Sequence, residues 1–484
     1  MHMQYRIISF IILSVLLNSC NTDNKTKGIS QDKKPNVLLI LVDDLGWTDL
    51  GSFGSDLYQS PHIDKLASEG VKFTSSYSAC TVCSPTRASI VTGKYPARLG
   101  VTDWIEGHKF PWAKLNVPDW TMYLDAKEYT MAEAFKDAGY KTAHFGKWHL
   151  GEKEENWPEY HGFDLNIGGW KKGSPQKNKK EGSKGYFSPY GNPRLKDGPE
   201  GEYLTERLAN EVCDYLDTSG DQPFFVNLWL YNVHTPLQAK QEKIDKYTPL
   251  IDPNAHHQNA TYAAMVEHTD DAVGQIIQKL KEKGLLENTI ILFSSDNGGL
   301  VGRSKKPVTN NSPLRTGKGD IYEGGVRVPT IIYAPQHNFK NKEVSEPIIS
   351  TDYYPTLMEL AGISNSKTEA QTVDGKSLLS LMEGHEDTKR EALYWHYPHY
   401  HQEGGVPYSS VLMDDWKLIE NFETDSIELY NLKEDISETK DLKKENPEIV
   451  SKLKGKLKEW RNEVNAQYAS PNKDYNKKKE RKKK

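Results

Sequence analysis

The sequence predicts an α/β protein that has a large, mostly parallel sheet between layers of helices and a smaller C-terminal α+β domain. Short runs of aliphatic and β-branched residues, typical of strands buried on both faces, alternate with stretches of helical length. After about Asp374 this alternation ends, and strand-like segments joined by polar turns follow. The 484 residues therefore fit one large α/β domain and one smaller domain.

The larger part contains five predicted strands and three predicted helices. The strands are the apolar runs 37–42, 141–145, 223–230, 289–293 and 328–333. One helix begins at Ser60, which precedes a proline, and ends at Gly70. Two more cover 130–138 and 261–283, and a glycine follows each of them closely. We expect these helices to cover both faces of the sheet.

The C-terminal part is predicted to contain antiparallel strands and one helix. The strands are 392–397, 409–422 and 427–432, and an amphipathic helix follows over 447–464. We therefore divide the chain into five segments, the two folded ones lying within the usual range of domain sizes. These are a signal (1–20), a tether (21–34), the larger domain (35–374), the α+β subdomain (375–470) and a basic tail (471–484).

The first twenty residues predict an export signal. Arg6 precedes an apolar stretch over 7–19, which is too short to span a membrane and ends at Cys20. This pattern resembles a bacterial lipoprotein signal, in which cleavage leaves the cysteine as a lipid-carrying N-terminus. We expect lipidation of Cys20 and a membrane anchor in the cell envelope, in the periplasm or at the outer membrane. An ordinary cleaved export signal is the alternative.

The charge distribution excludes a nucleic-acid-binding body. The net charge is -5, but the stretch from Lys473 to Lys484 alone has eight Lys or Arg and two Asp or Glu. The rest of the chain is therefore strongly acidic, whereas nucleic-acid-binding domains are basic. We predict that the tail is a solvated end. The four cysteines are too few for a disulfide scaffold, and Cys80 and Cys213 are predicted to be buried structural residues.

Polar side chains follow four of the predicted strands, where the ligands of an open α/β sheet bind. Taken singly, an aspartate after a strand often caps a helix, and Asp-Asn-Gly is a common turn. Taken together at one sheet edge, oxygen ligands and cationic groups predict a site for a metal and an oxyanion. The groups are Asp43 and Asp44 after 37–42, Lys147 and His149 after 141–145, Asn232 and His234 after 223–230, and Asp296 and Asn297 after 289–293.

The run Cys83-Ser84-Pro85-Thr86-Arg87, followed by a helical stretch and Thr92-Gly93, has the Cys-x-Pro-x-Arg pattern of type I sulfatases. From about Pro35 to Trp460 the chain resembles this family, which belongs to the alkaline-phosphatase-like superfamily. Further matching stretches are 60–67, 146–151, 316–319 and 322–325. The resemblance implies a sulfuric ester hydrolase in which a formylglycine-generating maturase oxidises Cys83 to formylglycine (3-oxoalanine).

The resemblance also implies a role for each polar group. His149 and His234 transfer protons, and Lys318 lies beside His234 at the leaving oxygen. Arg87 holds the modified residue 83, while Lys147 and Lys318 bind the sulfate group. The oxygen-rich metal site favours one Ca²⁺ over Mg²⁺, because Mg²⁺ keeps more of its waters. The metal ligands are Asp43, Asp44, Cys83 in its modified form, Asp296 and Asn297.

We expect a sulfated polysaccharide or its oligosaccharides as the substrate, since the protein is predicted to be exported. The run 394–401 is dense in aromatic and imidazole groups, so His399 and His401 are predicted to form sugar-binding subsites. Alternatively, this run is an aromatic strand buried between the two domains. The other activities considered are a phosphatase or phosphonate hydrolase of the same superfamily and a catalytically dead glycan-binding lipoprotein. The sulfatase pattern at Cys83 and the complete set of site residues argue against both.

Overall fold

The computed structural model describes residues 33–178, 182–302, 307–364, 367, 370–385 and 390–476. The described residues from Lys34 onward belong to one compact unit. The predicted signal with Cys20, nearly all of the tether and the last residues of the basic tail lie outside the described residues. Within the described part of the chain, no helix is long and apolar enough to cross a bilayer.

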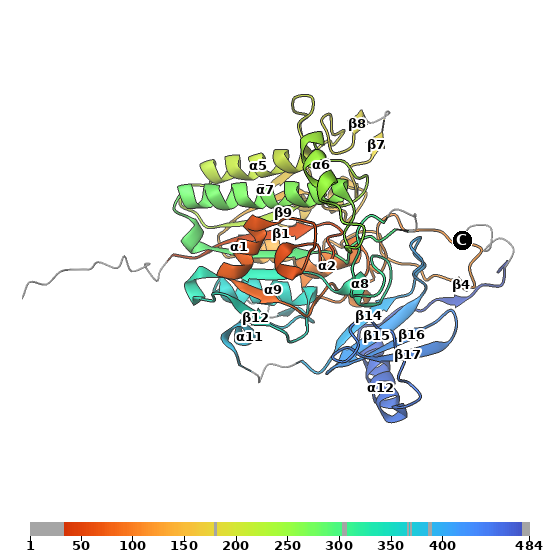
Figure 1. Cartoon of the computed structure of the whole chain (residues 1–484). Coiled ribbons are helices and arrows are strands. Elements are labelled where there is room, and N and C mark those ends of the chain that lie inside the picture. Colours follow the sequence, from red (N-terminus) through yellow and green to blue (C-terminus); the bar gives the residue numbers. More distant parts are fainter. Residues whose placement is uncertain are drawn as a thin grey trace, which may run out of the picture. The chain divides into compact units, whose positions relative to one another are not determined.

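An eight-stranded sheet forms the centre of the molecule, in the order β12-β2-β11-β10-β1-β9-β5-β6 (Figure 1). Only β11 runs antiparallel to its neighbours, which confirms the prediction of a large, mostly parallel sheet. The strands β2, β6 and β12 have three residues each, too few to form a hydrophobic pattern, and were not predicted. The bounds are β1 Asn36–Val42, β2 Val71–Phe73, β5 Lys141–Gly146, β6 Leu165–Ile167, β9 Phe224–Trp229, β10 Thr289–Ser295, β11 Thr330–Tyr333 and β12 Lys342–Val344.

Both faces of this sheet are covered, which explains why β1 is apolar at nearly every position. Alternate residues of β1, such as Ile40, pack with α1 (Pro61–Glu69), α5 (Leu204–Thr218) and α7 (Ala260–Glu282). The residues between them, such as Leu39, pack with α2 (Cys83–Thr92), α4 (Met131–Asp137) and α9 (Tyr353–Leu360). Figure 1 shows α5 and α7 lying along one face, beside β9 and β1.

Side-chain caps begin two of the helices on this sheet, and the remaining elements are short connections around it. Two predicted helices begin with a side-chain cap, since Thr130 forms a capping box with Glu133 at the start of α4 and Asn259 accepts a hydrogen bond from the Tyr262 amide at the start of α7. The short helices are α3 Pro96–Leu99, α6 Gln241–Tyr247, α8 Glu323–Val326 and α11 Leu379–Glu383. The short strands are β3 Ser76–Tyr77, β4 Leu115–Asn116, β7 Lys177–Asn178, β8 Ser183–Lys184, β13 Ile348–Ile349 and β18 Ser470–Pro471.

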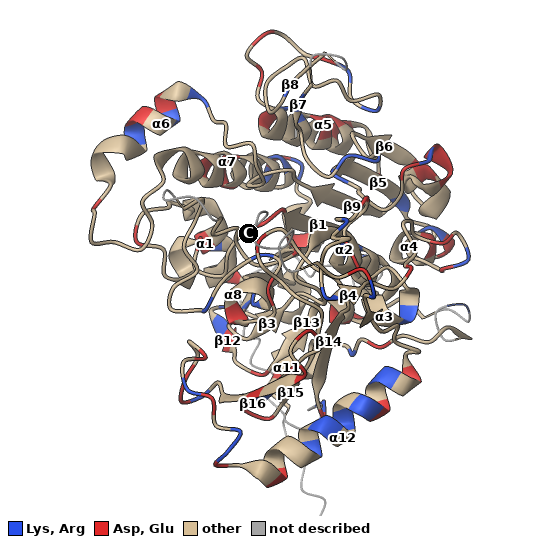
Figure 2. Ribbon diagram, turned by 90° about the vertical axis from the view of Figure 1, so that its right-hand side faces the viewer, with Lys and Arg blue, Asp and Glu red and all other residues tan. Residues whose placement is uncertain are grey.

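The C-terminal part contains a four-stranded antiparallel sheet with one long helix, α12 (Pro447–Glu463), packed on it. The stretch 409–422, predicted as one strand, is a hairpin that turns at Asp414, which has a left-handed φ of 53°. Figure 2 shows Lys and Arg positions, in blue, along the α12 ribbon, whereas Leu457 of this helix is buried against the sheet. The strands are β14 Leu393–Tyr397, β15 Tyr408–Met413, β16 Trp416–Asn421 and β17 Ser426–Asn431.

The small sheet shares a hydrophobic core with the segment that leads into α2. Trp395 and Tyr408 from the small sheet pack in one cluster with Tyr77, Cys80 and Val82. The Trp395 indole also donates a hydrogen bond of 2.9 Å to the Ser78 carbonyl. The small sheet therefore supports the backbone directly before residue 83. The predicted domain boundary at residue 374 stays a prediction.

Candidate active site

Four adjacent strand ends bring the predicted polar groups to one place. β10, β1, β9 and β5 are neighbours in the sheet, and charged side chains follow three of them. Lys147 Nζ lies 2.7 Å from Asp43 Oδ2, and Lys318 Nζ lies 2.6 Å from Asp44 Oδ1. The positions that meet here are Asp43, Asp44, Cys83, Arg87, Lys147, His149, His234, Asp296, Asn297 and Lys318. Their roles in catalysis and metal binding stay predictions.

Asn232 does not join this group, although it also follows a strand. Its side-chain oxygen accepts hydrogen bonds from the hydroxyls of Thr205 and Tyr203, and its amide donates to the Met265 carbonyl. Asn232 therefore fixes the end of β9 to α5 and α7. A structural role of this kind is the ordinary alternative for a polar residue at a strand end.

Cys83 is the first residue of α2, where the positive end of the helix dipole favours an anion. It lies at the base of a cavity of about 360 Å³, and only 3% of its surface is exposed. Burial raises the pKa of the Cys83 thiol to about 11, so the thiol is protonated at neutral pH. Lys318 Nζ lies 3.5 Å from its sulfur. The neighbouring Cys80 is buried and does not line this cavity.

The carboxylates after β1 and β10 fit a hard divalent cation. The donor atoms of Asp43, Cys83 and Asp296 all lie within 4.8 Å of one another. In the described part of the chain, Asp43 Oδ1 and Asn297 Oδ1 are buried without a hydrogen-bond partner. Burial raises the pKa of Asp43, and the charges of Asp296 and Asp44 raise it further against the opposing effect of Lys147. A divalent cation among these oxygens would relieve that repulsion.

Buried cations face the carboxylates and prepare the site for an anion. Although burial lowers the pKa of Arg87, the carboxylates of Asp296 and Asp43 raise it overall. For Lys318 burial is likewise outweighed, chiefly by Asp44, and its pKa is raised. These side chains therefore stay charged. In a site from which water is largely excluded, such fixed charges stabilise the oxygens of an anionic substrate strongly.

His149 is held as a neutral imidazole with one bare nitrogen. Its Nε2 hydrogen-bonds to the Ile105 carbonyl, so Nε2 carries the proton and Nδ1 is the acceptor. Nδ1 is buried and has no hydrogen-bond partner within the described chain. Burial, with the charge of Lys147, lowers the pKa of His149 well below its usual value. These features fit a base that accepts a proton from a nearby hydroxyl.

His234 is also neutral, and it lies between its own loop and Asp44. Its Nδ1 is 2.7 Å from the Thr235 carbonyl, so Nδ1 carries the proton, and Nε2 lies 3.7 Å from Asp44 Oδ2. Burial and the charge of Lys318 lower the pKa of His234 to about 3. Within the pair, therefore, the Lys318 ammonium is charged and Nε2 of His234 is unprotonated.

Asn311 joins loops of the site and was not predicted from the sequence. Its Nδ2 donates to the carbonyls of Gly299 and Thr316, at 2.9 and 3.0 Å. The Lys318 amide donates to the same Gly299 carbonyl at 3.1 Å. Asn311 thus holds the loop after Asn297 against the loop that carries Lys318. The polar run at 309–312 was the available signal, but such a run also suits an ordinary surface turn.

The two histidines that were predicted to bind sugar differ in their relation to the cavity at Cys83. His401 lines this cavity, whereas His399 does not line it and is only 1% exposed. His399 Nε2 is 2.8 Å from Thr102 Oγ1, and its ring packs edge-on against Trp120. The prediction for His399 therefore needs correction, because packing and a hydrogen bond engage its side chain away from the cavity. The buried-strand alternative describes much of this run, including Trp395.

Comparisons with known proteins agree with this geometry. The family model described as sulfatase matches residues 35–363, and a model described as N-sulphoglucosamine sulphohydrolase, C-terminal, matches residues 317–463. A sulfatase of Formosa agariphila is 33% identical, over 94% of this chain and 93% of the relative. The N-acetylgalactosamine-6-sulfatase of Canis lupus familiaris is 31% identical, over 75% of this chain and 68% of the relative.

Among solved structures, the crystal structure of Ps i-CgsB in complex with k-i-k-neocarrahexaose is similar to this chain. It has a TM-score of 0.73 and 30% sequence identity, and the match covers 88% of this chain and 93% of that one. The family model, the relatives and the structural neighbour all indicate the same family, and this family fits the polar groups found at the strand ends. The chain therefore belongs to the sulfatase family and is a sulfatase, an enzyme that hydrolyses sulfuric esters, with the fold of the alkaline-phosphatase-like superfamily.

Proposed function

We propose that this sulfatase removes sulfate from a sulfated polysaccharide or oligosaccharide, with Cys83 converted to formylglycine and one divalent cation bound. The main support is the position of Cys83, at the start of α2 and at the base of a cavity that Lys318 and two neutral histidines also line. The structural neighbour bound to k-i-k-neocarrahexaose and the N-acetylgalactosamine-6-sulfatase relative support a sulfated glycan as the substrate.

The cation would be held by Asp43, Asp44, Asp296 and Asn297, whose side-chain oxygens are buried beside residue 83. We propose Ca²⁺, because it accepts an irregular shell of many oxygens more readily than Mg²⁺ does. When bound, the cation would polarise a sulfate oxygen and favour the ionised form of an attacking hydroxyl. A zinc site built mainly from thiolates and imidazoles is disfavoured, since the donor clusters that include residue 83 in the described part of the chain contain carboxylates and a single imidazole, that of His234.

The side chains of this protein would then perform four tasks. Hydrated formylglycine would supply the nucleophilic oxygen and a second hydroxyl. Arg87 and Lys147 neutralise negative charge around residue 83. The bare Nδ1 of His149 accepts the proton of the second hydroxyl. The leaving oxygen takes its proton from the pair formed by Lys318 and His234, in which Lys318 is charged.

We further propose that the protein is exported and lipid-anchored in the cell envelope through Cys20, which the pattern of the first twenty residues supports. Oxidation of Cys83 requires a formylglycine-generating maturase, so this maturase is a necessary partner. A phosphatase is not favoured, because two-metal sites of that class use several histidines, and the donor clusters that include residue 83 among the described residues contain carboxylates and one imidazole.

The test combines mass spectrometry of the peptide that contains residue 83 with sulfate release from a panel of sulfated oligosaccharides. Protein from the native host should show formylglycine at residue 83 and should release sulfate from at least one oligosaccharide. Cys83→Ala should remove activity while the protein stays folded. Unmodified cysteine in an active enzyme, or activity of Cys83→Ala above a trace, would contradict the proposed nucleophile.

A further inference from the structure

We infer that Trp104 is the platform on which the sulfated sugar ring packs, in a cavity that a polar loop formed by residues 171–176 also lines. This inference rests on the proposed glycan substrate and specifies how the cavity would recognise it. The cavity is larger than a sulfate group requires and lies within the usual range of small-ligand sites, so it has room for a sugar ring.

The residues that line the cavity fall into two groups of different chemistry. One is the aromatic group of Trp104, His108 and His401, whose rings pack against each other in turn, and the other is the 171–176 loop. A pyranose has the matching asymmetry, because its axial C–H groups form an apolar face while its hydroxyls lie around the edge. The apolar face fits an indole ring, and the hydroxyls fit a wall of donors and acceptors.

Trp104 is held in place as a rigid surface. Its Nε1 donates a hydrogen bond of 3.1 Å to His108 Nδ1, and the two rings meet edge-on with centroids 4.7 Å apart. The His108 ring in turn packs edge-on against His401, with a centroid distance of 5.5 Å. Burial lowers the pKa of His108, which keeps the supporting ring neutral. A fixed aromatic ring binds a sugar at a low cost in conformational entropy.

The segment that follows Trp104 is tied directly to the catalytic groups. The Ile105 amide donates to Ser84 Oγ at 3.1 Å, and the Ile105 carbonyl accepts the Nε2 proton of His149. Ser84 directly follows the proposed nucleophile. The position of the indole relative to residue 83 and His149 is therefore fixed. A sugar packed on the indole would present its sulfate at a defined position.

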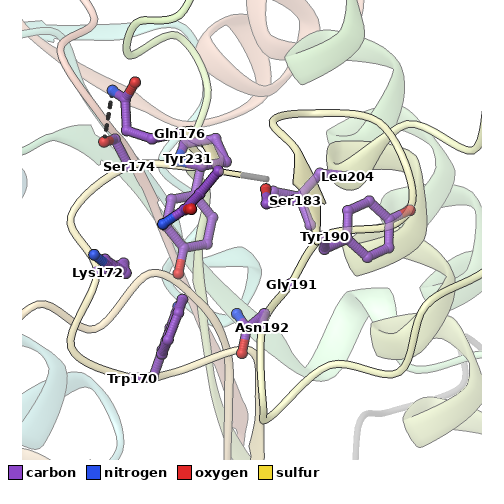
Figure 3. Close-up of a pocket in the computed structure, with 12 residues that line it drawn as sticks. Trp170, Lys172, Ser174, Gln176, Ser183, Tyr190, Gly191, Asn192, Leu204 and Tyr231 are labelled. Atoms are coloured by element: carbon purple, nitrogen blue, oxygen red, sulfur yellow. Dashed lines mark hydrogen bonds between the residues drawn. The ribbon is translucent and has the colours of Figure 1, made fainter. Parts of the chain in front are cut away.

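The 171–176 loop is polar and lies close to His149. A Cβ at Gly173 would be 2.4 Å from His149 Cε1, so this loop passes directly over the imidazole. Gln176 Nε2 donates to Ser174 Oγ at 3.0 Å, and Figure 3 shows this bond and, on the same loop, Lys172. Lys171 is exposed at the cavity mouth. Together these side chains offer hydroxyl, amide and ammonium groups to sugar hydroxyls.

The test measures competition, so that it does not depend on glycan turnover. k-i-k-neocarrahexaose and N-acetylgalactosamine-6-sulfate are each added to an assay of nitrophenyl sulfate hydrolysis, and their inhibition constants are determined. Trp104→Ala should raise the inhibition constant of the better competitor by about tenfold or more, which corresponds to ~1.4 kcal/mol. Trp104→Phe keeps an aromatic face and should stay within about threefold of the unaltered enzyme.

Trp112→Ala is the matched control, since Trp112 belongs to the same loop region but does not line the cavity. It should leave the inhibition constants unchanged. The inference is overturned if neither sugar competes in the unaltered enzyme, if Trp104→Ala changes competition by less than about twofold, or if Trp112→Ala has an equal effect. A sugar that competes through Trp104 but is never desulfated would contradict the proposed function and leave this inference intact.

Discussion

Two side-chain nitrogens of Arg87 contact the same carboxylate oxygen of Asp296, and both side chains are fully buried. Nε donates a hydrogen bond of 2.8 Å to Oδ2, and Nη2 lies 2.8 Å from the same atom. The other oxygen, Oδ1, accepts the Asp44 amide. Although burial raises it, the pKa of Asp296 is lowered overall, chiefly by Arg87. Asp296 is thus kept ionised in a buried place, as a metal ligand must be.

Arg87→Lys should therefore reduce kcat/KM by about a hundredfold or more, even though it conserves the charge. A lysine offers one ammonium and cannot reach Asp296 Oδ2 and the Lys147 carbonyl together, as the guanidinium does. It also lacks the planar surface that lies over Trp229, with the guanidinium carbon 5.2 Å from the ring centroid. Steady-state kinetics with nitrophenyl sulfate would measure this effect, and near-normal kcat/KM would show that charge alone suffices.

Removal of the divalent cation should abolish activity, and Ca²⁺ should restore it better than Zn²⁺. Asp43→Asn should raise the Ca²⁺ concentration needed for half-maximal recovery, because it removes a buried anionic ligand. Asp56→Asn is a suitable control, since Asp56 is an exposed residue whose carboxylate pairs with His257 and does not belong to the donor clusters of the described residues. Full activity after exhaustive chelation would contradict the metal site.

The sequence allowed prediction of the sheet and of the groups at its edge because both depend on local patterns. β1 is an uninterrupted apolar run, and the chain order places Asp43 directly after it. Parallel neighbours then bring the residues after β10 and β5 to the same edge. The Cys83 pattern supplied the chemistry. These inferences need no knowledge of how distant loops fold.

The walls of the cavity could not be predicted in the same way. The segment 104–108 has no strand or helix period, and its place depends on long-range contacts such as that between Ile105 and Ser84. His399 and His401 are two positions apart and of the same residue type, yet only His401 lines the cavity. The difference arises from the bond between His399 and Thr102, a contact that sequence spacing does not reveal.

Asn311→Ala should lower kcat by about tenfold or more while the protein stays folded. The substitution frees the carbonyls of Gly299 and Thr316 and loosens the loop that carries Lys318. If Asn311 positions Lys318, activity should fall more for a substrate with a poor leaving group than for nitrophenyl sulfate, because a poor leaving group depends more on protonation. Equal losses on both substrates would indicate a general structural role instead.

Asp103 should make the stability of the protein fall as the pH rises. Burial raises the pKa of Asp103 to about 7, despite hydrogen bonds from the Tyr397 hydroxyl and the Trp104 amide. The folded-state pKa of Asp103 lies above the ordinary value of 3.8. The stabilisation that protonated Asp103 gives to the folded state is therefore complete below about pH 4 and is lost as the pH rises through 7. The loss amounts to several kcal/mol at most.

Asp103→Asn keeps the size of the side chain and cannot ionise. Its melting temperature should therefore fall less between pH 5 and 8 than that of the unaltered protein, by roughly a few degrees. The comparison is made in one buffer series and at constant ionic strength, so that surface charges affect both proteins equally. Parallel melting curves at every pH would show that Asp103 does not titrate in this range.

Lys417 neutralises two carboxylates that are buried between the small sheet and the catalytic part. Its Nζ lies 2.9 Å from Glu323 Oε1 and 3.0 Å from Glu438 Oε1. Glu323 also accepts hydrogen bonds from Tyr77 and Arg327, and its amide donates to Glu438. The network fixes the segment that follows Lys318, so damage to it should affect both stability and catalysis.

Lys417→Met should destabilise the protein by about 3–5 kcal/mol, because it leaves Glu438 buried without its cation and leaves Glu323 paired with Arg327 alone. The double variant Lys417→Met/Glu438→Gln should recover part of this loss, since Glu438 no longer needs a countercharge. Burial already raises the pKa of Glu438 to about 7, so the amide resembles a protonation state near the native one. Chemical denaturation at pH 8 would measure the difference, and a double variant less stable than Lys417→Met would contradict the account of uncompensated charge.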